Sequence, residues 1–383
     1  MPMPKLPAAA ALSRRHFLHA LAAAGGVAAA ASFRASAALG GLGGLTEAPV
    51  GRVRVGILPG GLGESWSNGL HLSLAGVPGV SVDLSPRTGG MLDAVKHLAR
   101  QEMDVIVGAL TPAVSRGVDA ALNGSHAVFL NAEPGGHIQR AGDRRARVFH
   151  HTLQLWQANY AAGVWTAQNL GTRVATLCSF RDAGYDSVAA FAMGFESVGG
   201  QVVAKGVSHV PGRERSAARL VADLRAAQPD FIYVSASGKQ ARELLAAAGP
   251  GAVAAPQAHE ASDGVETAFS SAYRRVNGLK PDSLALLGYE AGALILAAAR
   301  EAHRSGGGFS DALGRAEFDG PRGHIGMNAE THTTTAAYVD GSGAPLRWLR
   351  PVAEREALAH PGWQQAVSGF SLAYGANPRV YRA

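Results

Sequence analysis

Residues 104–111 read DVIVGALT, a short apolar run of mostly β-branched residues that ends in a glycine and, three positions later, a threonine. Such a run is typical of a β-strand buried on both faces, and the threonine lies where the next helix would begin. Similar runs at 53–58, 80–84 and 127–130 are separated by helix-length segments. This alternation predicts a parallel sheet covered by helices on both faces, an α/β fold.

The second half of the chain repeats this pattern. Roughly 345 residues follow the N-terminal leader, which is too many for one compact core and enough for two domains. We therefore expect two α/β lobes in series, with a cleft at the carboxyl ends of their strands. The further strands are expected at 174–178, 201–207 and 231–234, and the further helices at 154–170, 186–199, 214–227 and 239–248.

The first 37 residues have the features of an export signal. Residues 13–18 read SRRHFL, the segment 21–31 is rich in alanine and glycine, and residues 35–37 read ASA, which suits signal peptidase. The arginine pair with phenylalanine and leucine resembles the twin-arginine signal, which exports folded proteins. The apolar run is too short to span a membrane, and no later stretch is expected to do so. We therefore expect a soluble periplasmic protein. No lipid anchor is expected, because no cysteine follows the cleavage site.

The charge of the mature chain argues against nucleic-acid binding. The whole chain has a formal charge of +6, which falls to +2 when the four basic residues of the leader are removed. The remaining basic residues are spread out and are not interleaved with aromatic residues that could stack on bases.

Several stretches resemble one protein family in their order along the chain. Residues 104–111, 128–131, 149–152, 180–185, 229–233 and 318–323, with a helix at 289–302, resemble segments of the type I periplasmic binding proteins. These include the branched-chain amino-acid binders of ABC importers. The resemblance implies two Rossmann-like lobes, with parallel sheets flanked by helices and joined by a three-segment hinge, that close on a small solute.

The resemblance also predicts domain limits and partners. The first lobe is expected to comprise 50–151 and 260–335, and the second 152–259 and 336–383. The expected function is to bind a small solute, an amino acid or a related polar or aromatic molecule, and to deliver it to an ABC permease in the inner membrane. The protein is expected to be a monomer. The alternative is a periplasmic sensing or accessory protein with the same fold.

Ligand contacts are expected from loops that follow the strands. The resemblance places Trp66, which follows the first glycine-rich loop, where the family often has an aromatic lid over the ligand, and burial in the lobe core is the competing interpretation. Thr111 lies at a helix N-terminus, where unpaired N–H groups suit a carboxylate. The remaining candidates are Asn131, Glu133, Tyr185, Ser235 and Glu260, and for Ser235 and Ser237 helix capping is an equally good interpretation.

The stretch Glu133–Gly136 departs from the amino-acid binders. A carboxylate at Glu133 would repel an anionic ligand unless Arg140 or a ligand amine compensates. This departure puts a standard α-amino-acid site in doubt, and the ligand stays unidentified from the sequence.

No catalytic or cofactor site is expected. There is no G-x-S-x-G nucleophile motif, and Gly60-Gly61-Leu62-Gly63 lacks dinucleotide-binding spacing. His150 and His151 are neighbours in an extended segment, so they face opposite sides and cannot share a metal ion. Cys178, the single cysteine, is expected to be a buried core residue.

Overall fold

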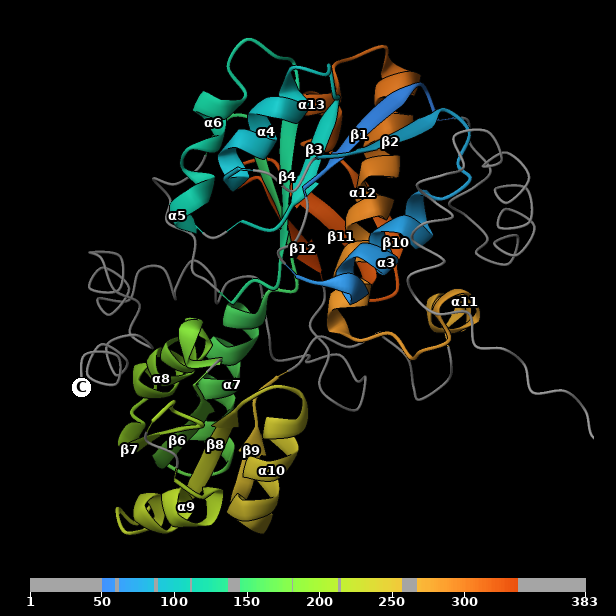
Figure 1. Ribbon diagram of the computed structural model, residues 1–383. Coiled ribbons are helices and arrows are strands. Elements are labelled where there is room, and N and C mark those ends of the chain that lie inside the picture. Colours follow the sequence, from blue (N-terminus) through green and yellow to red (C-terminus); the bar gives the residue numbers. More distant parts are fainter. Residues whose placement is uncertain are drawn as a thin grey trace, which may run out of the picture.

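The computed structural model describes residues 50–58, 62–85, 89–110, 112–136, 145–180, 182–212, 215–256 and 267–336. Residues 1–37, which the sequence predicts to be an export signal, lie outside these residues, as do Thr111, Arg140, Glu260 and the tail after Ala336. The described chain forms two lobes, each built on its own sheet (Figure 1).

The first lobe contains an eight-stranded sheet. Its strand order is β10-β11-β12-β5-β4-β3-β1-β2, parallel from β2 to β12 and antiparallel in the β10–β11–β12 part. The strands are β1 (Val53–Ile57), β2 (Val80–Leu84), β3 (Val105–Gly108), β4 (Val128–Glu133), β5 (Val148–Thr152), β10 (Glu317–Gly320), β11 (Gly323–Asn328) and β12 (Thr333–Ala336).

Helices cover both faces of this sheet. Apolar residues of α3 and α12 pack against the strand side chains on one face of the sheet. Those of α4 and α6 pack against the strand side chains on the other face. The helices are α3 (Glu64–Leu74), α4 (Met91–Ala99), α5 (Pro112–Ser115), α6 (Val118–Ala121), α11 (Ala268–Asn277), α12 (Ser283–Ser305) and α13 (Phe309–Leu313).

The second lobe has a parallel four-stranded sheet of order β7-β6-β8-β9. The strands are β6 (Arg173–Ser179), β7 (Gln201–Ser208), β8 (Phe231–Ser235) and β9 (Ala252–Ala254). The helices are α7 (Leu155–Asn169), α8 (Ser187–Ser197), α9 (Ala217–Arg225) and α10 (Gly238–Ala248), with 3-10 turns η2 (Asp182–Gly184) and η3 (Gly249–Gly251). The chain enters this lobe between β5 and α7 and leaves it after β9.

Glycines bring the backbones of two helix pairs into direct contact, one pair in each lobe. In the first lobe a Cβ on Gly69 would lie 1.9 Å from the Ala285 carbonyl oxygen of α12. In the second lobe a Cβ on Gly194 would lie 1.9 Å from the Tyr160 carbonyl oxygen of α7. These distances are far below van der Waals contact, so α3 with α12 and α7 with α8 pack without an intervening side-chain layer.

The α/β alternation is confirmed, and several boundaries differ from the sequence-based expectation. The helix-length segment at 113–122, between two of the expected strands, is not one helix but two short helices separated by a turn at 116–117. The strand expected over 127–130 continues to Glu133, since β4 pairs with β5 from Phe129 to Glu133. β2 is an edge strand, which leaves Leu84 66% exposed. β9, α11 and α13 were not expected.

Helix α12 corrects one expectation about membrane spans. By length and composition alone this helix could cross a bilayer, although no later span was expected. It is instead the central core helix of the first lobe, because 78% of its most apolar window is buried. The lobe boundaries remain a prediction, because the connection at 257–266 and the tail lie outside the described residues. Thr152 and Ala336, expected at the edges of the second lobe, are the last residues of β5 and β12 in the sheet of the first lobe.

Candidate functional site

The carboxyl ends of the two sheets meet at a contact between the lobes. Gly136, three residues after β4, accepts a hydrogen bond through its carbonyl from the Asp186 N–H at 2.7 Å. Tyr185 packs on the same glycine, where a Cβ would lie 2.7 Å from Tyr185 Cδ1. The predicted contact residue Tyr185 therefore lies at the junction of the lobes and is half-buried there.

The segment Glu133–Gly136 is held close to the start of α7. Glu133 is the last residue of β4 and is buried. Gly135 has φ +75°, and a Cβ there would lie 2.7 Å from Gln154 N. The Gly135 carbonyl accepts from Trp156 N–H at 2.9 Å. Glycine is required here by both the left-handed backbone and the close approach, so Glu133 is carried on a fixed strand end and not on the loop expected from the sequence.

The predicted contact Asn131 has a structural role in this conformation. Its Oδ1 accepts from Leu110 N–H at 2.7 Å, and its Nδ2 donates to the Leu110 carbonyl at 3.1 Å. The side chain is buried, so both bonds are shielded from water. Asn131 thereby fixes the residue that precedes Thr111.

Asp182 occupies the N-terminus of α10 in the second lobe. Its carboxylate accepts from the Ser237 backbone N–H at 3.1 Å and from Ser179 Oγ. A carboxylate is favourable at a helix N-terminus because of the partial positive charge there. Ser237 is the N-cap residue of α10 and makes no side-chain capping bond, so the capping role that the sequence suggested for it is not seen, and Asp182 binds its backbone N–H instead.

Ser235 ends β8 and is buried, whereas Lys239 in the first turn of α10 is exposed. Asp182, Ser235 and Lys239 thus come together at the carboxyl end of the second sheet. The charged groups described at this end include the carboxylate of Asp182, which already accepts hydrogen bonds from Ser237 N–H and Ser179 Oγ.

Trp66 is a core residue of the first lobe in this structure. It is 2% exposed and packs with the β-sheet and α12. A Cβ on Gly288 of α12 would lie 2.0 Å from the Trp66 carbonyl oxygen, which shows how closely the two helices pack. The indole Nε1 has no hydrogen-bond partner in the part of the chain that the structure describes. These features fit the competing interpretation of Trp66 as a core residue.

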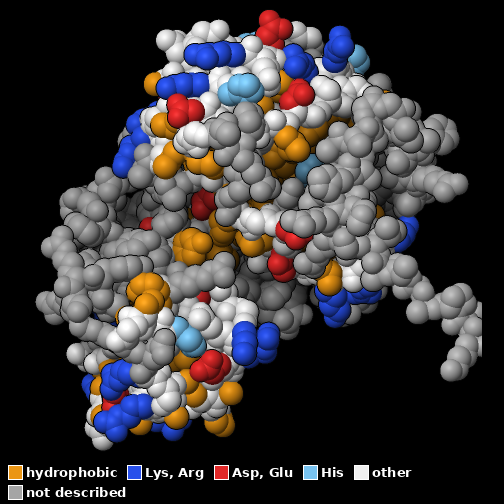
Figure 2. Space-filling model, in the orientation of Figure 1, with side chains coloured by type: hydrophobic (Ala, Val, Ile, Leu, Met, Phe, Trp, Pro, Cys, Tyr) orange, Lys and Arg blue, Asp and Glu red, His pale blue; other side chains and the backbone are white. Residues whose placement is uncertain are grey.

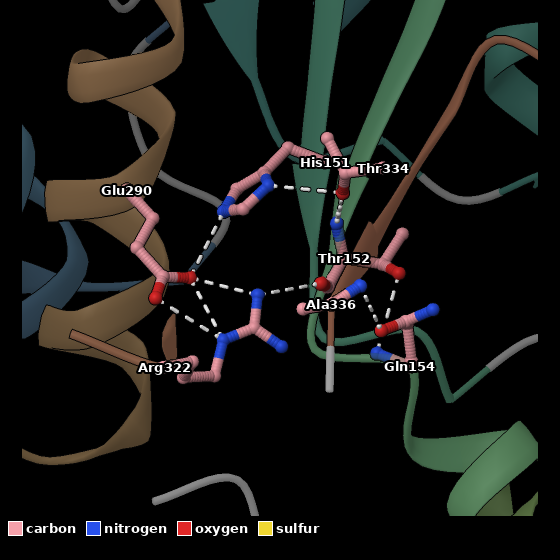
Figure 3. A network of polar contacts seen from close by, with 7 residues as sticks. All are labelled: His151, Thr152, Gln154, Glu290, Arg322, Thr334 and Ala336. Atoms are coloured by element: carbon pink, nitrogen blue, oxygen red, sulfur yellow. Dashed lines mark hydrogen bonds and ion pairs between the residues drawn. The ribbon is translucent and has the colours of Figure 1, made fainter. Parts of the chain in front are cut away.

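A buried polar network, not foreseen from the sequence, lies where β5 and β12 end (Figure 3). Arg322 Nη2 and Glu290 Oε2 lie 2.7 Å apart, and both side chains are almost fully buried. The same guanidinium donates to the Thr152 carbonyl at 3.1 Å. Glu290 and Arg322 both lie in motifs that the resemblance had identified, but their pairing depends on the tertiary fold.

The network ties the ends of the two strands together. Thr334 Oγ1 of β12 lies 3.1 Å from His151 Nδ1 and accepts from Thr152 N–H at 3.2 Å. Gln154 Oε1 accepts from Ala336 N–H at 3.0 Å. The start of the connection to the second lobe is therefore fixed to the first lobe by side-chain hydrogen bonds.

Burial and charge act in opposite directions on this network. Burial would raise the pKa of Glu290, but Arg322 and His151 outweigh it and hold the pKa below the usual 4.5. Burial lowers the pKa of His151 in spite of Glu290. The ion pair is therefore formed by Glu290 and Arg322, with a neutral His151 beside it.

The remaining residues considered in the sequence, Cys178 and the possible metal ligands, show no reactive or metal-binding arrangement in the described part of the chain. Burial, with a smaller effect of Asp182, raises the pKa of the Cys178 thiol to about 12, so the thiolate is suppressed. Within the described ranges, no group of three His, Cys, Asp or Glu side chains could hold a metal ion. On the face shown in Figure 2, described Lys and Arg side chains are scattered over both lobes among Asp and Glu.

Comparisons with known proteins agree with this architecture. The family described as periplasmic binding protein matches residues 85–251. No match was found among the curated proteins. An ABC transporter substrate-binding protein from Sphaerobacter thermophilus is similar in structure, with a TM-score of 0.59 and 18% identity over 77% of this chain and 95% of that one.

Two further solved structures have the same architecture. One is a solute-binding protein of an ABC transporter from Rhodopseudomonas palustris in complex with 3,4-dihydroxybenzoic acid, with a TM-score of 0.57 and 20% identity over 76% of this chain and 93% of that one. The other is a putative branched-chain amino acid ABC transporter from Rhodospirillum rubrum, with a TM-score of 0.56 and 22% identity over 76% and 98%. The chain has the type I periplasmic binding protein fold.

Proposed function

We propose that this protein is the periplasmic substrate-binding component of an ABC importer. It closes its two lobes over a small solute, an amino acid or a related polar or aromatic molecule, and delivers it to a permease in the inner membrane. The observation that carries the proposal is the contact of Gly136 with Tyr185 and Asp186, which joins the carboxyl ends of the two sheets. Ligands of parallel α/β sheets bind at these ends.

The comparisons support this function without identifying the solute. The similar structures include a protein that holds an aromatic acid and one described as a branched-chain amino acid transporter. Both are under 25% identical to this chain, and the segment from Glu133 to Gly136 departs from the amino-acid binders. The proposal therefore covers both solute classes.

We assign the predicted contacts to two groups. Thr111, Glu133, Tyr185, Ser235 and Glu260 are proposed to contact the solute. Asn131 and Trp66 are proposed to support the site, because the first holds the Leu110 backbone and the second packs in the core. Export by the twin-arginine route after removal of residues 1–37, a monomeric state and the absence of catalysis belong to the same proposal.

A thermal-shift screen tests the proposal. The mature protein would be stripped of carried-over ligand by unfolding and refolding, then screened against amino acids, amides, aromatic acids and small alcohols. A solute at a hundred times its Kd should add about 2.7 kcal/mol of stability. Tyr185→Ala should reduce the shift of any hit, whereas Asp223→Asn, on α9, should leave it unchanged.

The outcome separates two functions. A hit confirmed by calorimetry supports a solute-binding cleft and gives the chemistry of the ligand. Silence from a well-folded protein across the panel contradicts the importer proposal in favour of the accessory-protein alternative, which twin-arginine export also suits.

A further inference from the structure

We propose that Gln154 is a positioning residue that sets the angle between the lobes at which the solute is held. Its side-chain amide fastens the first turn of α7, in the second lobe, to the last residue of β12, in the first lobe. The inference deepens the proposed function and rests on it, because lobe closure matters only if the cleft binds a solute. The argument starts from the backbone of Gln154.

Gln154 has a backbone conformation that its residue type disfavours. Its φ is +54°, in the left-handed region, and it occupies the N-cap position of α7. Residues other than glycine are uncommon there, and such conformations persist only where the surroundings enforce them. Gln154 N–H donates to Thr152 Oγ1 at 3.2 Å, and its carbonyl accepts from Ala158 N–H at 3.0 Å. The chain thus turns sharply between β5 and α7 at this residue.

The side chain of Gln154 bridges two segments that are far apart in sequence. It is 3% exposed, and its Oε1 accepts from Ala336 N–H at 3.0 Å (Figure 3). Ala336 is half-buried and the oxygen that its N–H binds is buried, so water is a poor substitute for this acceptor. The bond joins the connection into the second lobe to the end of the last described strand of the first lobe.

The first-lobe side of this bridge is rigid. Arg322 donates to the Thr152 carbonyl and is itself held by Glu290, and Thr334 Oγ1 accepts from Thr152 N–H. The ends of β5 and β12 are therefore fixed to each other and to α12. Rotation between the lobes must begin after Thr152, and Gln154 is the second residue beyond it.

The helix on the other side has a second attachment to the first lobe. Trp156 N–H donates to the Gly135 carbonyl, beyond the end of β4. The start of α7 is thus attached to two different strands, through Gly135 and through Gln154. Two separated attachments define an orientation where one would allow rotation, and this orientation brings Gly136 against Tyr185.

Three substitutions separate the hydrogen bond from the backbone conformation. Gln154→Met keeps the length of the side chain but removes the acceptor. Gln154→Asn suits the left-handed backbone better, but it is one methylene too short to reach Ala336. Gln154→Glu keeps an acceptor at the original reach and is the conservative rescue.

Solute affinity and thermal stability are measured for all three variants. Gln154→Met and Gln154→Asn should both weaken solute binding by about tenfold, the effect of losing one hydrogen bond. The Tm of Gln154→Asn should be higher than that of Gln154→Met, and Gln154→Glu should bind solute within about threefold of the unsubstituted protein. Equal affinity across all variants, equal weakening in all three including Gln154→Glu, or an affinity that follows Tm would overturn the inference.

A distance measurement tests the bridge from Gln154 to Ala336, called the clamp here, without any solute. Spin labels on cysteines at Leu84 in the first lobe and Leu170 in the second use two exposed sites. The interlobe distance distribution should broaden or shift in Gln154→Met and Gln154→Asn and stay narrow in Gln154→Glu. If no solute is found but the distances respond in this way, the clamp stands and the proposed function fails. If solute binds but neither distances nor affinity respond, the clamp is wrong and the function stands.

Discussion

Gly136 of the first lobe lies so close to Tyr185 of the second that a single added methyl group would overlap the ring. The Cβ of an alanine at position 136 would come within 2.7 Å of Tyr185 Cδ1 and 3.1 Å of its Cβ. The contact is reinforced by the hydrogen bond from Asp186 N–H to the Gly136 carbonyl. The fit between the lobes therefore depends on the absence of a side chain at Gly136.

Gly136→Ala should push the lobes apart and weaken solute binding by about tenfold or more, because overpacking costs about 1–3 kcal/mol. Titration calorimetry with the solute found in the screen measures the effect. Gly251→Ala in the second lobe is the matched control, since a Cβ there meets nothing within 4 Å. Unchanged affinity in Gly136→Ala would show that this contact is not used in closure.

Glu290→Gln should lower stability by about 3–5 kcal/mol, because it leaves the buried guanidinium of Arg322 without a full counter-charge. Thermal unfolding at neutral pH measures this loss. The double variant Glu290→Met with Arg322→Met removes both charges and should recover most of the stability. A double variant as unstable as Glu290→Gln would mean that the pair acts through packing alone.

The same ion pair should make the protein sensitive to acid. The pKa of Glu290 lies below its usual 4.5 in the folded chain, mainly because Arg322 outweighs the effect of burial. A lowered carboxyl pKa adds stability above the unfolded value, and this stability is lost as the pH falls through the folded value. Tm should therefore fall more steeply below about pH 4.5 in the unsubstituted protein than in Glu290→Gln. Parallel Tm curves for the two proteins would contradict this.

His150 should cause an earlier loss of stability on acidification. Burial, with a contribution from His332, lowers its pKa from 6.5 to about 4. Below pH 6.5 the unfolded chain binds a proton that the folded chain does not, so stability falls between pH 6.5 and 4, by about 3 kcal/mol in all. His150→Gln should flatten the Tm profile in this range, whereas the exposed His97→Gln should reproduce the original profile.

Cys178 should resist modification in the folded protein. Its pKa is raised to about 12, chiefly by burial, so little thiolate exists at pH 8. A thiol-reactive chromophore should react with the native protein many times more slowly than with protein unfolded in denaturant. Fast native labelling would mean that β6 opens readily and would require replacing Cys178 before the spin-label experiment.

Much of the fold follows from periodicity alone. Short runs of β-branched and aromatic residues such as 105–107 and 231–234 favour buried strands, and the structure places them as interior strands of the two sheets. β4 was expected to end too early because Asn131 and Glu133 are polar. The Asn131 side chain is accommodated in the strand by its bonds to the Leu110 backbone, and the strand continues to Glu133 because its backbone pairs with Thr152 of β5.

The site was less accessible to sequence reasoning than the fold. Tyr185 was singled out and lies at the junction of the lobes, yet its neighbour Gly136 was noticed only as part of a departure from the family. Glu290 and Arg322 are 32 positions apart, and no local pattern links them. Gln154 carries no sequence signal, because its role depends on a left-handed backbone and on the distant Ala336.

The helix crossings at Gly69 with Gly288, and at Gly163 with Gly194, have a consequence for how the chain tolerates variation. At each of these four positions an added Cβ would lie about 2 Å from a carbonyl oxygen of the partner helix. In a saturation-mutagenesis library only glycine should be tolerated at these four sites, and alanine should be as poorly tolerated as leucine or lysine. Their tolerance would not track hydrophobicity at all, and the two lobes would share the same signature although they share no sequence.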